Sequence, residues 1–261
     1  MCTVTLRCGG GSLLLTMNRD ERYERASESA PRRIPGEPGR PAWIAPFDGG
    51  TGGTWIGVND RGVAACLLNG YTDSDRDLIG RAGVPSRGSI VPRVLEEPQE
   101  PGPARVPGPL DFSAYPSFTL LVASADGGEV VRWSSAGAVT REPLGPGWHL
   151  LTSSSWSEPE VAAWRRRAFD SWRASGQPLV HGIPTVHLLA PAGEEASAPF
   201  MTREKSGTRS ISQVRVADGA PEATLSWWPR TGKAAIDPGV PGATITIPML
   251  VPNPDASGGE A

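Results

Sequence analysis

Long hydrophobic runs are missing from this sequence of 261 residues, and hydrophobic residues make up only 38% of it. No apolar stretch approaches the roughly 20 residues that a helix needs to cross a bilayer, and the start lacks the basic and then apolar plan of a secretory signal. The net charge of −3, without a basic block, argues against nucleic acid as a partner. We therefore expect a soluble, cytoplasmic protein without a membrane span.

Cysteine and histidine are also scarce. The three cysteines, Cys2, Cys8 and Cys66, cannot all pair within one chain, which argues against a disulfide scaffold. The three histidines are scattered, and there is no CxxC and no Cys/His cluster. The sequence therefore predicts neither a metal site nor a cofactor.

The first element that the sequence predicts is a β-hairpin. Residues 2–8 alternate between apolar and polar side chains, the period of a half-buried strand. Three glycines at 9–11 signal a turn, and residues 12–18 read as the returning strand. Because residues equidistant from a short turn face each other, residues 18–20 are expected beside Cys2.

Further strands and two helices are expected along the chain. The predicted strands cover residues 54–58, 62–69, 118–124, 130–134, 148–153, 209–216, 223–228 and 242–250. One helix is expected at 85–96. A longer one begins at Ser157, which with Glu160 matches a capping box. In this helix Val161, Trp164, Ala168 and Trp172 share a face at helical spacing.

Proline and glycine mark the remaining segments. Residues 26–50 and 97–117 are predicted to be loops, and residues 253–261 a disordered tail. Nothing in the pattern suggests a repeat or a domain boundary, so we expect one domain over 1–252. Strand hairpins at both ends with a long helix between them favour the α+β class, with helices packed on antiparallel sheet.

Cys2 is the first candidate for chemistry. Once the initiator methionine is removed, it would carry a thiol nucleophile and a free α-amine. The ordinary pKa of that amine, about 7.7–8.0, suits a general base. Asp20 could orient the amine, and Arg19 could hold that carboxylate or a substrate acid. The alternatives are a start-site residue without a role and a charged hairpin end in water.

Asn69 ends a hydrophobic strand and could donate a hydrogen bond to an oxyanion. The alternative is a turn asparagine, because Gly70 follows it. Glycines at 52–53 lead into Thr54 and Trp55. They could let the backbone approach a ligand or could be ordinary turn residues.

Together these motifs resemble the NRDE family, which is related to transport-and-Golgi-organisation protein 2. The resemblance rests on MCT at the start, MNRDE at 17–21, GGTWIGV at 52–58, SRGSIVPRVL at 86–95 and GTRSISQV at 207–214. That family in turn looks like N-terminal-nucleophile hydrolases of the bile-salt-hydrolase and penicillin-acylase kind. The implied fold is an αββα sandwich of antiparallel sheets flanked by helices.

The resemblance implies Cys2 as nucleophile and base, Asp20 as partner of its amine, and Asn69 as oxyanion donor. It also implies a late arginine, Arg230, that supports the cysteine. Where the hydrolases have Arg-Asn-x-Asp, this chain has Met17-Asn18-Arg19-Asp20. The arginine has moved to a neighbouring position, so we expect Arg19 to face the other way. The remaining candidates for substrate binding are Asn18, Thr54, Trp55 and Ser153.

The function predicted from this pattern is an amidohydrolase or acyltransferase that forms an acyl-Cys2 intermediate on a small acyl or amide substrate. The alternative is a carrier without catalysis that holds haem or an acyl lipid in the same pocket. The sequence leaves the acyl group, its acceptor and the oligomeric state open.

Overall fold

The computed structural model describes residues 2–108, 110–153, 159–176 and 179–250. Its strands form two large antiparallel sheets and one small one. The first sheet has the strand order β10 (Gly147–Ser153), β1 (Cys2–Gly9), β2 (Ser12–Arg22), β13 (Ser206–Val216), β14 (Glu222–Pro229) and β15 (Ala243–Pro248).

The second sheet keeps its strands in chain order. It consists of β3 (Ser29–Ile34), β4 (Trp43–Phe47), β5 (Ile56–Asn59), β6 (Ala64–Asn69), β7 (Phe118–Ser124), β8 (Gly127–Trp133) and β9 (Val139–Leu144). A small pair, β11 (Leu179–Val180) and β12 (Ile183–Pro184), is separate from both.

Helices are few in the described part of the chain. The α-helices are α1 (Ile90–Leu95) and α2 (Pro159–Ala174), and short 3₁₀ turns lie at η1 (Asp73–Asp75), η2 (Arg87–Ser89) and η3 (Thr185–Leu188). None of the helices described is long and apolar enough to cross a membrane.

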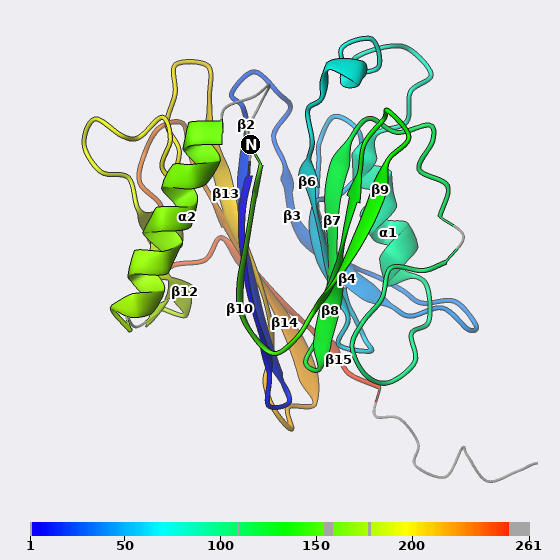
Figure 1. Ribbon diagram of the computed structural model, residues 1–261. Helices are drawn as coiled ribbons and strands as arrows, with labels where there is room; N and C mark the ends of the chain where they lie inside the picture. Colours follow the sequence, from blue (N-terminus) through cyan, green and yellow to red (C-terminus); the bar gives the residue numbers. More distant parts are fainter. Residues whose placement is uncertain (1, 109, 154–158, 177–178, 251–261) are drawn as a thin grey trace, which may run out of the picture.

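The two large sheets pack face to face, with α2 beyond the first sheet and α1 beyond the second (Figure 1). The largest apolar cluster lies between the sheets and joins side chains such as Val4 and Leu15 of the first to Ile56 and Val58 of the second. Alternate residues of the second sheet pack outward on α1. Leu150 of the first sheet packs on Phe169 and Trp172 of α2 in the same way. The layers therefore follow the predicted sandwich, although each outer layer holds one short or medium helix.

The predicted amino-terminal hairpin is confirmed. Gly9, Gly10 and Gly11 all have positive φ values, of 118°, 59° and 70°, which glycine adopts without a side-chain clash. This turn fixes the register so that Cys2 pairs with Arg19. The start of the chain therefore meets the polar run of β2.

Three expectations about local structure are wrong. Residues 26–50 are not a continuous loop, because β3 and β4 lie within them. Pro31 lies within β3, where the pairing with β4 is irregular, and Pro46 lies within β4. The other prolines and the glycines of this segment lie outside the two strands. The sequence pattern also missed β9, whose residues are mostly exposed and so lack an apolar alternation.

The third error is the buried face of α2, which is rotated by one residue. The buried side chains are Val161, Arg165, Phe169 and Trp172, whereas Trp164 is only half-buried and its indole nitrogen lies 2.6 Å from a carboxylate oxygen of Glu194. The predicted cap at Ser157 and the predicted tail at 253–261 lie outside the described residues.

Candidate active site around Cys2

Cys2 is the first residue of β1 and lies between β2 and β10, paired with Arg19 and Ser153. Its backbone nitrogen donates a hydrogen bond to Ser153 Oγ at 3.1 Å. Its carbonyl oxygen accepts bonds from Thr152 Oγ1 at 3.2 Å and from Arg165 Nη1 at 3.3 Å. These contacts fix the backbone on both sides of the thiol.

A cavity of about 370 Å³ opens at this end of the two sheets, and the Cys2 side chain is one of its walls. Six residues predicted as functional from the sequence line it: Cys2, Arg19, Asp20, Thr54, Trp55 and Asn69. They come from β1, β2, the segment before β5 and the end of β6. The fold therefore brings together motifs that are separated by up to 67 positions in the sequence.

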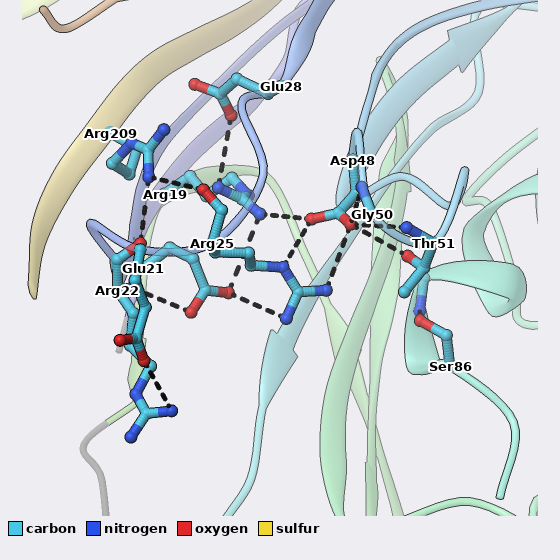
Figure 2. A network of polar contacts seen from close by, with 12 residues as sticks. Arg19, Glu21, Arg22, Arg25, Glu28, Asp48, Gly50, Thr51, Ser86 and Arg209 are labelled. Carbon is cyan, nitrogen blue, oxygen red and sulfur yellow. Dashed lines mark hydrogen bonds and ion pairs between the residues drawn. The ribbon is translucent and has the colours of Figure 1, made fainter. Parts of the chain in front are cut away.

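Arg19 faces the cavity on the same side of the sheet as Cys2, because directly paired residues of an antiparallel sheet share a face. Its guanidinium lies 4.5 Å from the Trp55 ring, 2.7 Å from Asp48 and 3.5 Å from Glu28. Figure 2 shows Arg19 between these two carboxylates. Arg19 is thus held as a buried, multiply paired cation in the wall beside the thiol.

Asp48 is the centre of this network (Figure 2). It accepts from Arg19 and Arg25, at 2.7 and 2.8 Å, and from the backbone and hydroxyl of Thr51 at 2.9 and 3.1 Å. Burial opposes ionisation of Asp48, but the bonds from Arg25 and from the Thr51 backbone outweigh it and lower its pKa to about 2. The carboxylate is therefore ionised at neutral pH and anchors both arginines.

Asp20 follows Arg19 in sequence and contacts the opposite layer. Arg165 of α2 donates to its carboxylate at 3.2 Å and Thr208 of β13 donates at 2.8 Å. Burial raises the pKa of Asp20, and the guanidinium of Arg165 opposes this rise. Arg165 also reaches the carbonyl of Cys2, so one side chain joins the predicted nucleophile to the predicted carboxylate.

Asn18 lies outside the cavity, although it was a candidate for substrate binding. Its amide nitrogen donates to the carbonyls of His187 and Pro199 at 2.9 and 2.7 Å. Its oxygen lies 2.6 Å from Nδ1 of His187, whose Nε2 lies 2.8 Å from the Thr5 hydroxyl. Burial lowers the pKa of His187 to about 3, which keeps the ring neutral. The position of Asn18 is that of a buried support for the outer layer.

Arg230 also lies away from the cavity. Its guanidinium donates to the carbonyls of Met201, Lys233 and Ala234 at 2.7–3.0 Å and stacks over the Phe200 ring. It braces the chain on either side of β13 and does not reach Cys2. Ser153 is likewise outside the cavity lining, but it contacts the backbone nitrogen of Cys2.

Two glycines bring the segments GGTW and SRGS together. A Cβ on Gly53 would lie 2.7 Å from the backbone of Gly88, and the amide of Thr54 donates to the Gly88 carbonyl at 3.0 Å. Only residues without side chains allow so close an approach. Gly53, Thr54 and Gly88 all form part of the cavity wall.

The thiol itself is protected from water. Burial raises the pKa of Cys2, and the charge of Asp20 adds to this rise. The amino-terminal charge opposes it, and the Arg19 guanidinium does so more weakly. All three cysteines are free and buried. The described residues contain no group of three or more His, Cys, Asp or Glu side chains that could hold a metal ion. The chemistry that this site offers is therefore that of a thiol next to polar and cationic groups.

Sequence reasoning missed four arginine and aspartate residues of this site: Arg25, Asp48, Arg87 and Arg165. Arg165 did carry a signal. It lies four residues after Val161 and four before Phe169, so it is a charged residue on an apolar helix face. Asp48 carried none, because it lies in a segment read as a plain loop.

Three comparisons place these features among known proteins. The family model described as Transport and Golgi organisation 2 matches residues 1–175. No curated protein sequence matches the chain. Among solved structures, an N-acylethanolamine-hydrolyzing acid amidase ortholog from Caenorhabditis elegans is similar, with a TM-score of 0.53 and 12% identity over 84% of this chain and 94% of that one.

A variant of the conjugated bile acid hydrolase from Clostridium perfringens is similar as well. Its TM-score is 0.50 and its identity 11%, over 96% of this chain and 97% of that one. At such low identity these likenesses show the fold alone, which this chain shares with the two hydrolases.

Proposed function

Because the chain belongs to the transport and Golgi organisation 2 family and has an amide-hydrolase fold, we propose that it is a cysteine amidohydrolase or acyltransferase. Its substrate is a small acyl or amide compound, and it works through an acyl-Cys2 intermediate. The observation that carries this proposal is that the Cys2 side chain, at the first position of β1, lies in the wall of a cavity that Asn69 also lines.

Removal of Met1 must precede the reaction, because it turns the nitrogen of Cys2 into an α-amine. Ser153 Oγ, 3.1 Å from this nitrogen, would then hold the amine. Because burial raises the pKa of the thiol, the resting group is protonated, and its proton passes to the amine as the sulfur attacks the carbonyl carbon. The thiolate therefore forms only during the attack, by proton transfer to the amine, and the resting site holds the neutral thiol.

The attack places negative charge on the carbonyl oxygen of the substrate. Asn69 and a backbone amide donate to this oxyanion. The protonated amine then gives its proton to the leaving group, the carbon–nitrogen bond breaks, and the acyl group stays on Cys2. Water or another acceptor releases the acyl group in a second, matching step.

Arg165 and Asp20 act in this scheme as positioning residues. Arg165 contacts both the Asp20 carboxylate and the Cys2 carbonyl, at 3.2 and 3.3 Å. It thereby holds the carboxylate that Arg19 was a candidate to hold. Arg19 supplies positive charge on the open side of the thiol, where it opposes the rise in the thiol pKa.

The carrier of haem or an acyl lipid is the weaker candidate. Charged side chains such as Arg25, Asp48 and Glu21 form much of the cavity wall, whereas a site for such ligands is mostly apolar. No contact of the described residues favours it.

Intact-mass spectrometry of the purified chain tests the proposal. The mature mass should lack Met1, and incubation with a library of activated acyl esters and amides should add one acyl mass at Cys2. Cys2→Ala should abolish this adduct. Cys8→Ala, at the other end of the same strand, should keep it. A chain that retains Met1, or an adduct that survives Cys2→Ala, would contradict the mechanism.

A further inference from the structure

The segment between β6 and α1 contributes two arginines, Arg81 and Arg87, to the cavity beside Cys2. We propose that the substrate carries a carboxylate, which Arg87 and Arg81 bind while its reacting carbonyl lies between Cys2 and Asn69. The inference rests on the proposed function, because it names the substrate class of that same site.

The other charges of the cavity are already paired. Arg19 and Arg25 share Asp48 at 2.7 and 2.8 Å, and Glu21 lies 3.6 Å from Arg25. The remaining acid of the wall, Asp20, is paired with a guanidinium of α2. These contacts neutralise the wall on the β2 side, so they leave it little capacity to bind an ionic substrate.

Arg87 and Arg81 differ from these residues. Within the described part of the chain, neither has a carboxylate oxygen within 4 Å of its guanidinium. Arg81 is exposed, whereas Arg87 is half-buried. A partly buried cation without a counterion is costly to the fold, and a carboxylate ligand would offset that cost through a charge-assisted, two-point contact.

The fold holds Arg87 rigidly for this purpose. Its Nη1 donates to the carbonyls of Gly70 and Ser117, at 3.0 and 2.8 Å, and its guanidinium lies 5.5 Å from the centre of the Tyr71 ring. Burial lowers the pKa of Arg87, opposed first by its interaction with Tyr71. Tyr71 and the two carbonyls therefore orient the cation. The charges of Asp75 and Glu21 also act on it, but neither carboxylate pairs with it directly.

The position of Arg87 also indicates where the carboxylate lies in the substrate. Gly70, its backbone partner, follows the predicted oxyanion donor Asn69 directly. Arg87 and Asn69 both line the cavity of Cys2 and a neighbouring cavity of about 480 Å³, so they stand where the two meet. A substrate carboxylate is thus expected within a few bonds of the reacting carbonyl.

A matched pair of ester probes tests this inference. The 4-nitrophenyl monoester of glutaric acid and 4-nitrophenyl valerate have equal chain lengths and differ in the terminal carboxylate. The wild-type protein should be acylated by the glutaryl ester with the lower KM. Arg87→Gln should raise that KM roughly 10- to 100-fold, as expected for loss of a charge-assisted contact, and should raise the KM for the valerate ester by a much smaller factor.

Two further variants keep the test decisive, because Arg87→Gln also removes bonds to Gly70 and Ser117. Arg81→Gln, at an exposed position, should raise the KM for the glutaryl ester alone. Arg33→Gln, on the exposed side of β3 away from the cavity, should behave as wild type. Equal KM values for both esters in the wild type and in both cavity variants would overturn the inference and leave the proposed function intact.

Calorimetric titration with glutarate separates the two proposals. Suppose that glutarate binds in a way that depends on Arg87 and Arg81, but that no acyl probe ever modifies Cys2. This combination of results would support the carboxylate site and refute the proposed catalysis. An N-acylglycine and the corresponding N-acylethanolamine form a second matched pair, in which the carboxylate is on the leaving group. Preference for the glycine compound would place the carboxylate on that side of the scissile bond and would equally support the inference.

Discussion

The four consecutive residues Asn18, Arg19, Asp20 and Glu21 form two different polar regions. Arg19 and Glu21 point to the cavity side of β2 and join a network with Arg25, which is partly open to solvent. Asn18 and Asp20 contact the fully buried groups beneath α2. The strand period of two separates them, so one run of sequence supplies both the support of the site and its charged wall.

The difference is one of burial and therefore of energy. We call the buried groups beneath α2 the outer region; they include Asn18, Asp20, Arg165 and His187. Every charged or polar group there must keep its hydrogen-bond or ion-pair partner, because no water can replace that partner. In the cavity network, solvent and a substrate can compensate part of a lost contact. The outer region should thus govern stability, whereas the cavity region should govern reactivity and recognition.

Arg165→Met is expected to have the largest effect on stability. It leaves the Asp20 carboxylate buried without its ion-pair partner, which costs about 3–5 kcal/mol of unfolding free energy. Urea denaturation at pH 7 measures this loss. Arg167→Met, on the exposed side of the same helix, should change stability by no more than about 0.5 kcal/mol. A loss below about 1 kcal/mol in Arg165→Met would show that the outer region is not the tighter one.

Asp48→Asn probes the cavity network. The folded pKa of about 2 lies below the ordinary value of 3.8, so the ionised Asp48 adds stability above pH 4 that is lost as the pH falls through 2. The variant should lose on the order of 2 kcal/mol at pH 7, and its difference from the wild type should shrink between pH 4 and 2. Denaturation at several pH values measures this, with exposed Asp126→Asn as control. A difference independent of pH would remove the charge from the explanation.

His187→Gln tests the outer region through the pH dependence of the unfolding free energy. Its effect over the pH range measured should be the smallest of the three. The folded pKa of about 3 lies below the ordinary 6.5. Unfolding therefore takes up a proton between these values, and stability falls as the pH drops below 6.5 by up to about 1.4 kcal/mol per pH unit. His187→Gln should flatten this slope between pH 6.5 and 5.5, and His149→Gln should keep it. An unchanged slope in His187→Gln would mean that another group titrates.

Local sequence patterns predicted much of the fold around Cys2. The alternation of residues 2–8 and the glycines at 9–11 specify the hairpin and its register, so the meeting of Cys2 with residues 18–20 followed from the sequence. Thr54, Trp55 and Asn69, which belong to or follow the family motifs, lie in the wall of the same cavity as residues of that hairpin. Patterning failed at β3, β4 and β9, because their prolines or exposed residues hide the strand period.

The site itself was only partly predictable. Arg19 was expected to face away from the position of the hydrolase arginine, and this was wrong. Met17, which stands at that position, lies two residues before Arg19 on β2 and therefore on the same face, and the pairing with Cys2 shows that Arg19 faces the thiol. The contact to Asp20 comes instead from Arg165, 145 positions further along the chain. Arg230 matched the pattern of the resemblance, but its bonds to neighbouring loops hold it away from the cavity.

The sequence by itself determined the local elements near Cys2, because strand period, turn glycines and apolar faces act over a few residues. Only the tertiary structure decided which cation forms an ion pair with which carboxylate. Asp48 and Arg165 come from segments with no sequence signal that links them to Arg19 and Asp20, and packing of the two sheets and α2 brings each to its partner. Charge pairing depends on distances between side chains across the fold, and no local pattern encodes such distances.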